Sequence, residues 1–572
     1  MKRFIFTCIR ILTLAVFVLI CPRPLGADNA QTLIPAGHWV YDAARDIFSE
    51  AGYTAFYTDA PMPQAELELY LSEIDYETLS VYGKTQYDRI YAYVTRKPLS
   101  IGSGVVSAGL ELALTPELYY KTNPDIDWSF RYHYKDDIAV LPLFLAVSDV
   151  LFIESDLFFG KNYWAAREPY NWNNFPFTFI AEPPYLDYNT SEFFFPRRAY
   201  MSVGFDIKDT AFFNLQIGRN PFSIGMTQNK SIILSDVFET DGYARFSIFS
   251  PNIKYTLTAV QADVEKYLYL HHIQFRLFKK LQLGLIEGAY VNAPFELRFL
   301  NPLAIMHQFA FWNSYPDSGI NNCSAYFAFT FDYTPVRYLR IYGLYAQNEL
   351  QLPQESLSTS GKSYPLSLGF QLGAETTVPF KDHGAWHAAV EGVYTMPWLY
   401  VKHTPDSSLI RFRNDNLYPT SALITSWIGT PFGPDSIAAS AKLGYEVPGK
   451  WSVSLAYLWL AQGENAFAEN LFFRDGKKLD PDDEETGDAD KYYPPTYVKD
   501  DPDRAIEEAN KRTPSGIPQY TNQIQLEGSY SFTENIALAA RITYTIVIND
   551  DNIDGKFEQG AEFAVSCRFK LL

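Results

Sequence analysis

The sequence predicts an all-β protein: an outer-membrane antiparallel β-barrel of roughly 18 strands, preceded by a small N-terminal α-helical periplasmic domain. Two regularities and the composition lead to this prediction. From Val105 onward, apolar and polar residues alternate in segments of about 10 residues, the length with which a tilted strand crosses a bilayer. Aromatic residues make up 16% of the chain, whereas its mean hydropathy of -0.14 is close to neutral. A barrel with an aromatic-rich outer band and a polar lumen combines both properties.

The second regularity is that the connections between these segments alternate between short and long. Short ones are expected at 208–210, 250–252, 279–280, 333–336, 447–449 and 533–535, and long ones at 160–197, 220–242, 291–322, 347–364, 396–436 and 461–519. A soluble β-sandwich has no reason to keep its short turns at one end, whereas outer-membrane barrels have short periplasmic turns and long external loops. The alternating stretch DIDWSFRYHY at 125–134 is therefore expected to be a strand whose aromatic residues face lipid.

The last residues fit the same architecture. In EFAVSCRFKLL, Phe563, Val565 and Phe569 alternate with polar residues such as Glu562 and Arg568. This alternation predicts a strand that closes the ring. Closure matters because an unpaired strand edge would leave backbone N–H and C=O groups without partners in lipid.

Residues 1–27 predict a signal peptide. MKRFIFTCIR is positively charged, ILTLAVFVLI is apolar, and CPRPLGA offers a cleavage site near Ala27, so we expect export and a place in the bacterial outer membrane. The apolar run of about ten residues is too short to span a bilayer as a stable helix. Ile20 stands where a small residue precedes a lipidated cysteine, so ordinary cleavage is favoured over lipidation of Cys21. Cys323 and Cys567 then remain, too few for a disulfide scaffold.

Residues 28–100 predict the periplasmic helical domain, and residues 101–572 the transmembrane barrel with long external loops. The stretch HWVYDAARDIFSEAG has apolar residues at helical spacing and stops at Gly52, a favourable C-cap residue. A second helix is expected from Pro63, and a third over Leu79 to Val94. The domain is too small to bury much core alone, so we expect it to dock on the barrel. A packing role and a contact with peptidoglycan or a periplasmic partner both stay open.

No catalytic or metal motif stands out, and we expect a non-enzymatic protein without a cofactor or metal. The chain lacks a G-x-S-x-G nucleophile motif. His271 and His272 are neighbours on a predicted strand and so point to opposite faces, a poor metal pair. DDNIDGKFEQ at 550–559 resembles a calcium loop, but Ala561 replaces the bidentate Glu, and a turn explains the same residues. The net charge of -19 argues against nucleic acid as a partner.

Aromatic and basic residues gather in the expected external loops. Sugar rings stack on aromatic faces and Arg binds carboxylates, so these residues predict a polysaccharide-binding surface; an aromatic girdle at the membrane interface is the alternative. The candidates are Trp164, Tyr170, Trp172, Trp312, Tyr315, Arg411 and Arg413. The acidic run at 475–510 is interpreted as a solvated loop, with divalent-ion bridging to anionic sugars as the alternative.

Several motifs, in their order along the chain, resemble the capsule-assembly outer-membrane protein family (Wzi-like). They are HWVYDAARDIFSEAG near the N-terminus, LQIGRNPFSIGMTQNKSIILSD at 215–236, LGLIEGAYVNAPFELRFLNPLAIMHQ at 283–308, and SWIGTPFGPDS at 426–436. The family-motif positions are Gly218, Arg219, Glu287, Asn301, Pro302 and Asp435. The resemblance implies a barrel of 18 strands with a periplasmic helical domain. It also implies that the external loops bind or organise a capsular or extracellular polysaccharide in a lectin-like manner.

The family resemblance further implies a plugged barrel. Residues 137–147 and parts of 296–312 break the two-residue period, and we expect them to fold inward as helices or plugs. The alternative function is a porin or channel for small polar or apolar solutes, because a barrel of this size can also enclose an aqueous lumen.

Overall fold

The structure is a computed structural model. It describes residues 29–96, 99–103, 105–123, 125–126, 137–161, 186–187, 192–193, 198–207, 211–237, 241–306, 323–349, 365–381, 383–402, 405–415, 422–474, 477–478, 507–508 and 510–571. The expected signal peptide and much of the long loops, including most of the acidic run, lie outside these residues.

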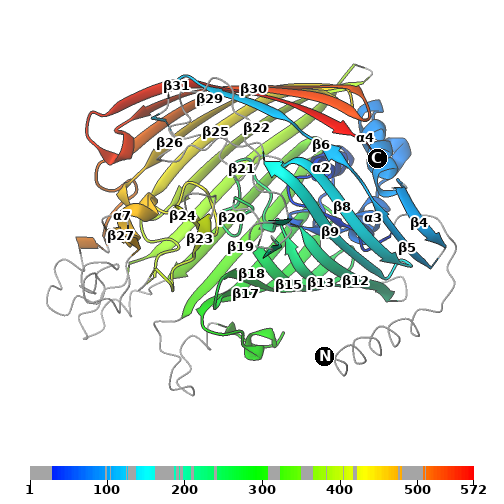
Figure 1. The fold of residues 1–572 in the computed structure, drawn as a ribbon, viewed down its shortest axis with the longest axis horizontal. Helices are drawn as coiled ribbons and strands as arrows, with labels where there is room; N and C mark the ends of the chain where they lie inside the picture. Colours follow the sequence, from blue (N-terminus) through cyan, green and yellow to red (C-terminus); the bar gives the residue numbers. More distant parts are fainter. Residues whose placement is uncertain are drawn as a thin grey trace.

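The main body is a closed antiparallel barrel of 18 strands (Figure 1), as the alternation predicted. Its wall contains β4 (Leu99–Ser103), β5 (Val106–Leu110), β6 (Ala113–Leu114), β7 (Glu117–Lys121), β8 (Asp137–Val147), β9 (Leu151–Lys161), β12 (Ala199–Ile207), β13 (Ala211–Asn220), β15 (Asp241–Phe249), β16 (Ile253–Asp263), β17 (Lys266–Leu277), β18 (Leu281–Asn292), β19 (Cys323–Val336), β20 (Leu339–Glu349), β21 (Ser367–Phe380), β22 (Gly384–Thr395), β25 (Ser436–Val447), β26 (Trp451–Gln462), β29 (Gln519–Thr533), β30 (Ile536–Ile548) and β31 (Phe557–Lys570). Of these segments, β5, β6 and β7 are successive parts of one interrupted strand between β8 and β31, and β4 forms a short hairpin with β5.

The C-terminal strand closes the ring, as its alternation predicted. β31 pairs with β30 on one edge and with β6 and β7 on the other. Phe563 lies opposite Tyr120, and Val565 opposite Leu118. All four of these side chains are more than a third exposed, which places apolar surface on the outside of the seam. Backbone pairing thus continues around the ring where an open edge would face lipid.

The short connections lie at one end, as predicted, and the long ones lie mostly at the other. β25 and β26 are joined by 448–450, β29 and β30 by 534–535. The expected turn at 333–336 is misplaced, because β19 continues to Val336 after an irregularity in its register and the turn falls at 337–338. One external connection is short, since two residues, 264–265, join β16 to β17.

Only the first two residues of the stretch 125–134 lie in the described part, so the strand with lipid-facing aromatic residues stays a prediction. Asp125 and Ile126 form a bend between β7 and β8, and Ile126 is buried. The rest of the stretch lies outside the described residues. The Nζ of Lys121 donates to the Ile126 carbonyl oxygen, which holds this part of the connection against the wall.

Residues 137–147 were expected to fold inward, and this prediction is wrong. They form β8, a strand of the wall. Its inner face carries Phe144 and Ala146, which pack in a small apolar cluster with Leu33 of the N-terminal domain, Phe152 and Tyr200. Apolar partners on both faces explain why the strand lacks a clear two-residue period.

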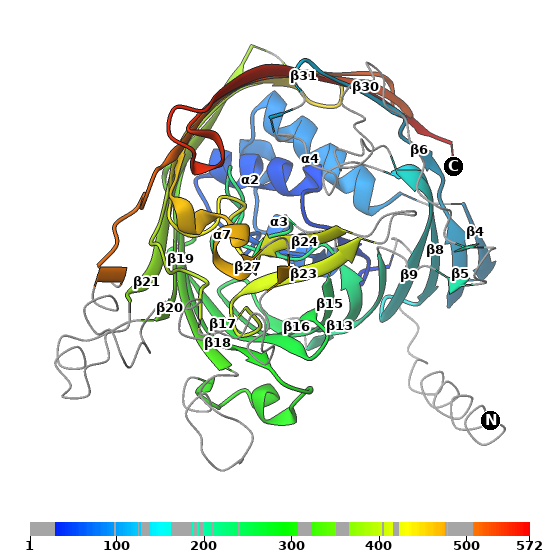
Figure 2. The same ribbon diagram turned by 60° about the vertical axis from the view of Figure 1, so that its left-hand side comes forward.

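Residues 29–96 form a small domain inside the ring of strands (Figure 2). Its elements are β1 (Leu33–Ile34), α2 (Trp39–Ala51), β2 (Asp59–Ala60), β3 (Met62–Pro63), α3 (Gln64–Leu71), η1 (Tyr76–Thr78) and α4 (Val81–Val94). Helix α2 ends at Gly52, whose φ of 78° is the left-handed conformation that glycine favours. Among the described helices, none has the length and apolar character needed to cross a membrane.

The remaining described elements belong to connections at the external end. They are β10 (Leu186–Asp187), β11 (Glu192–Phe193), β14 (Ser223–Ile224), η4 (Leu297–Leu300), β23 (Ile410–Asp415), β24 (Ala422–Trp427), η6 (Glu464–Ala466), α7 (Ala468–Phe472), β27 (Phe473–Arg474), β28 (Lys477–Lys478) and η8 (Asp550–Asn552). Several of them fold into the lumen.

We expect an arginine on the outer face of β26 to destabilise the barrel far more than one on the inner face. Leu455 points outward and is 52% exposed, whereas its neighbour Ser454 points inward and pairs with Glu527 of β29. Leu455→Arg should cost about 2–4 kcal/mol in a bilayer, while Ser454→Arg gains a carboxylate neighbour. Urea unfolding in vesicles measures both, and equal losses would contradict this assignment of faces.

Candidate functional site in the lumen

The N-terminal domain is held to β16 by a buried ion pair and to β17 by a contact between a carboxylate and a histidine. The Lys254 Nζ lies 2.5 Å from Glu66 Oε1, and both side chains are almost fully buried. The His272 Nδ1 lies 3.0 Å from Asp59 Oδ2. Buried charges are costly unless they are paired, so each charge on the wall requires its partner on the domain.

A second group of charges joins the domain to β19, β20 and β21. Thr54 donates from Oγ1 to Asp332 Oδ1 at 2.7 Å, and Arg340 Nε lies 2.5 Å from Asp332 Oδ2. The same guanidinium places Nη1 2.7 Å from Glu375 Oε1, which also lies 2.9 Å from Arg45 Nε. From Thr54 of the domain the contacts therefore run through Asp332, Arg340 and Glu375 of the wall, whose charges alternate in sign, and return to Arg45 of the domain.

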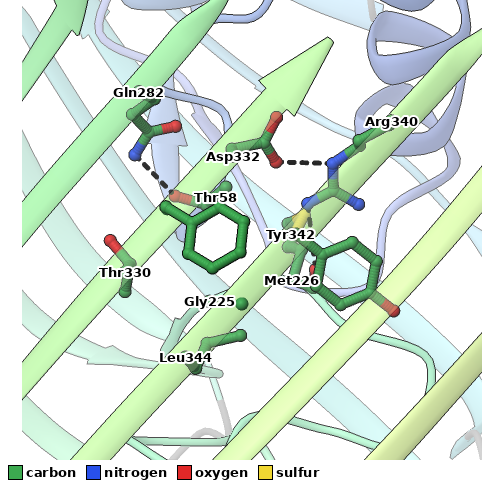
Figure 3. Close-up of a pocket in the computed structure, with 11 residues that line it drawn as sticks. Thr58, Gly225, Met226, Gln282, Thr330, Asp332, Arg340, Tyr342 and Leu344 are labelled. Atoms are coloured by element: carbon green, nitrogen blue, oxygen red, sulfur yellow. Dashed lines mark hydrogen bonds and ion pairs between the residues drawn. The ribbon is translucent and has the colours of Figure 1, made fainter. Parts of the chain in front are cut away.

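A small cavity remains beside Arg340, between the domain, the wall and an external connection (Figure 3). Its volume is about 10 Å³, and Figure 3 shows Thr58, Met226, Gln282 and Arg340 around it. Gln282 Nε2 donates to Thr58 Oγ1 at 3.4 Å across one side. A space of this size holds about one water molecule and is too small for a sugar ring.

The external connection that reaches this cavity enters the lumen from the opposite end of the barrel. We call its described part, residues 221–237, the inward loop. Its strand β14 pairs with β2 of the N-terminal domain, with Ile224 opposite Asp59. Gly225 follows with a φ of 88°, and a Cβ there would lie 2.3 Å from Leu344 Cδ2. Glycine thus lets the loop turn against the wall.

One buried carboxylate, that of Glu391 on β22, fixes the tip of the inward loop. It accepts hydrogen bonds from the backbone N–H of Gln228 at 2.9 Å and of Asn229 at 3.0 Å. It also accepts from Asn229 Nδ2 at 2.8 Å, Gln371 Nε2 at 2.9 Å and the Tyr342 hydroxyl at 2.5 Å. Three of these five hydrogen bonds come from the loop tip, and together they hold it in one position against β22.

A second external connection, 396–435, packs on the inward loop. The Tyr400 hydroxyl of this connection donates to the Ile232 carbonyl oxygen at 2.5 Å. From the wall, the Tyr326 hydroxyl of β19 donates to the Ile233 carbonyl oxygen at 2.8 Å. Ile232, Ile233, Tyr400 and Trp427 belong to one large buried apolar cluster with inward side chains of the wall. The external connections therefore form a hydrophobic core inside the barrel, above the N-terminal domain.

Of the predicted polysaccharide-binding residues, only Arg411 and Arg413 lie in the described part of the chain. Arg411 is 1% exposed; its Nη2 lies 2.8 Å from Asp241 Oδ2, and its Nη1 donates to the Trp427 carbonyl oxygen at 3.2 Å. Arg411 thus anchors the β23–β24 hairpin inside the lumen. Arg413 lies on β23, and its side chain is outside the described part. The aromatic candidates Trp164, Tyr170, Trp172, Trp312 and Tyr315 lie outside the described residues.

The family-motif positions are divided between the two sides of the wall. Asp435 is buried and accepts from the Ser515 backbone N–H at 3.0 Å and the Asn465 backbone N–H at 3.3 Å, which ties two external connections together. Gly218 and Arg219 lie on β13, opposite Tyr200 and Ala199 of β12. Glu287 lies on β18 opposite the outward His271, and Asn301 and Pro302 lie on the connection after β18, whose Phe299 stacks on Tyr269 on the outer side of β17. Parts of 296–312 were expected to fold inward; the described residues 296–306 do not, and 307–312 lie outside the described residues.

The charged residues that fix the lumen contents were missed from the sequence. Asp332, Arg340, Glu375 and Glu391 occupy polar positions of alternating strands, and this alternation does indicate that they face inward. It does not indicate their partners, because Asp332 and Thr54 are 278 residues apart in the chain. An unusual density of charge on adjacent inward faces would have been the available signal.

No group of three or more potential metal ligands occurs among the described residues. The calcium-loop-like stretch forms the turn between β30 and β31. Lys556 occupies its carboxylates, with Nζ 2.7 Å from Asp550 Oδ2 and 2.5 Å from Asp551 Oδ2. Of the carboxylates at the calcium-loop positions, that of Asp550 is thus paired with an ammonium group.

The fold is similar to those of bacterial outer-membrane barrels. Wzi of Escherichia coli, described as a carbohydrate-binding β-barrel involved in group 1 capsule assembly, aligns with a TM-score of 0.54 and 12% identity over 93% of this chain and 98% of that chain. OprD of Pseudomonas aeruginosa aligns with a TM-score of 0.38 and 9% identity, over 81% of this chain and 95% of that one. OmpT of Vibrio cholerae aligns with a TM-score of 0.33 and 9% identity, over 82% of this chain and 99% of that one. Neither a family model nor a curated protein matches the sequence.

By its fold this chain is a closed β-barrel of the outer-membrane type. Its likeness to Wzi extends over almost the whole length of both chains but is one of structure, at an identity that shows the fold alone.

We expect Glu391→Ala to release the tip of the inward loop. The substitution leaves the donors of Gln228, Asn229 and Gln371 without their shared acceptor, and hydrogen bonds to a charged group contribute about 1.5–3 kcal/mol each. Backbone amides of 228–232 should exchange hydrogen at least about tenfold faster. Glu446→Ala is the control, because Glu446 on β25 faces Arg89 of the N-terminal domain instead. Equal exchange in both variants would contradict the role of Glu391.

We expect the start of α2 to loosen between pH 7 and pH 5. His38 caps this helix by accepting from the Val40 N–H, and burial, with the charges of Arg96 and Arg198, lowers its pKa from 6.5 to about 3. Between these values the unfolded state binds more protons than the folded state, so stability is complete above pH 6.5 and falls as the pH is lowered.

The measurement is hydrogen exchange of the amides of 39–44. In His38→Asn the cap remains and the titration is removed, so the acceleration at pH 5 should disappear. The same pH dependence in the variant would show that another group is responsible.

Proposed function

We propose that this protein is a non-enzymatic outer-membrane barrel whose external loops bind or organise a surface polysaccharide, capsular or extracellular, in a lectin-like manner. The observation that carries the proposal is the packing of the external connections. The inward loop pairs with the N-terminal domain through β14 and β2, and the connection 396–435 packs on it. Loops whose bases pack inside the barrel hold their binding residues in place, so less conformational entropy is lost when a ligand binds.

The same packing favours polysaccharide binding over transport. On the side of β15 to β22 the lumen is occupied by the N-terminal domain and by the apolar core, whereas a porin of this type keeps a water-filled channel. The description of Wzi as a carbohydrate-binding barrel agrees with this choice. Wzi is also described as involved in capsule assembly, and we propose the same role for this chain.

Export by the N-terminal signal peptide and a periplasmic contact complete the proposal. The N-terminal domain lies at the end of the barrel with the short turns, which is the periplasmic end in outer-membrane barrels. Tyr91 of α4 is 63% exposed and Val81 50% exposed. Peptidoglycan or a periplasmic protein could contact this surface, while outer-membrane lipid surrounds the wall.

We expect the refolded protein to show no steady conductance in planar bilayers and to be retained on a column of the parent organism's surface polysaccharide. Replacement of Trp164, Trp172 and Trp312 by Ala should weaken retention, because it removes stacking surface from the external loops. The control is Trp386→Ala with Trp451→Ala. These side chains are exposed on the outer wall near the short turns, far from the external loops, and should leave retention unchanged.

Steady conductance without retention would overturn the proposal and favour a porin or channel. Retention that survives in the triple variant would keep polysaccharide binding but reject these three residues. Hydrolysis of the column polysaccharide by the protein would reject the non-enzymatic assignment.

A further inference from the structure

The connection between β18 and β19 lies on the outside of the barrel. Its described part, residues 293–306, is drawn in green outside the ring of strands in both views (Figures 1 and 2). We call it the outer-wall segment. Phe299 is 1% exposed and stacks on Tyr269 of β17, with ring centroids 4.8 Å apart. Tyr269 points outward, because the alternate residues of β17, such as His272, contact the N-terminal domain in the lumen.

Beneath this segment the outer wall carries polar side chains. His271 of β17 lies opposite Glu287 of β18, and the Tyr255 hydroxyl lies 3.0 Å from His271 Nδ1. The backbone of Phe299 and Pro302 faces the His271 ring. Ionisable side chains on the lipid face of a barrel are costly. The segment therefore turns its polar backbone toward the polar part of the wall and leaves His271 and Glu287 only partly exposed.

The other face of the segment is apolar and exposed. Leu303 is 91% exposed, Leu297 76% and Ile305 57%. Further toward the short-turn end of the same strands, Leu285 and Phe275 point outward and are 44% and 40% exposed. These two residues belong to the apolar band that faces the membrane, and the apolar face of the segment continues this band toward the external end.

We propose that the outer-wall segment is a lipid-binding element. Its exposed leucine and isoleucine side chains contact acyl chains of the outer leaflet, and the segment seals His271 and Glu287 from the hydrocarbon. The occupant follows from continuity with the lipid-facing band and from the absence of charge on Leu297, Leu303 and Ile305. This lipid contact does not depend on polysaccharide binding.

The test is fluorescence quenching in nanodiscs made with phosphatidylcholine whose acyl chains carry bromine. Leu303→Cys is labelled with a small fluorophore in full-length protein in which Cys323 and Cys567 are replaced by Ala. Val390→Cys is the lipid-facing reference, since Val390 is 57% exposed on the outer face of β22. Val264→Cys is the aqueous reference, because Val264 is 77% exposed in the external turn after β16. Aqueous iodide is the second quencher.

Bromolipid should quench the label at 303 nearly as strongly as at 390 and several-fold more than at 264, while iodide should show the reverse order. Strong iodide quenching at 303 with weak bromolipid quenching would overturn the proposal, because the segment would then lie in water. Weak quenching by both would overturn it too, since another protein surface, such as a second copy of this chain, would then cover the segment.

Discussion

The structure depends on the pairing of β31 with β7, because a β-sheet can cross a membrane only when it has no free edge. Closure imposes a lumen, and its inner face carries the polar half of every strand. Lys254, His272 and Arg340 would be stable there if they were hydrated, but they lie under the N-terminal domain. Once water is excluded, each of them requires a partner: Glu66 and Asp332 supply the opposite charges to Lys254 and Arg340, and the Asp59 carboxylate lies 3.0 Å from the His272 ring.

The N-terminal domain and the external connections stabilise each other inside this lumen. The domain offers β2 as an edge, and β14 of the inward loop pairs with it. Glu391 then fixes the turn that follows, and the aromatic side chains of the connection 396–435 cover the loop. The contact between a segment from the end with the long connections and a domain at the end with the short turns is thus built from backbone pairing, a buried carboxylate and apolar packing. Each of these fixes the position of the next.

The sequence predicted the elements that local pattern determines. The alternation predicted the barrel and its closing strand, and Gly52 marked the end of α2. Residues 137–147 were misassigned because both faces of β8 are apolar, one toward lipid and one toward Leu33. The candidate site was less predictable. Arg411 has the chemistry of a glycan ligand, yet the fold brings Asp241 to it from a strand 170 residues earlier. Side-chain type indicates what a residue can bind, whereas the long-range fold decides which partner it meets.

A comparison of the two halves of the inner wall shows why such a small domain is sufficient to pair the buried polar residues of the lumen. Lys254 and Gln274, on the half that the domain contacts, are fully buried. On β25, β29 and β31, by contrast, the inward residues Lys442, Ser529 and Arg568 are exposed. Exposed polar groups can be hydrated, so these three side chains need no partners from the domain, whereas Glu446 near the short turns of β25 does pair with Arg89 of the domain. A domain of this size cannot cover the whole inner surface, and it covers the part whose charges its own side chains match.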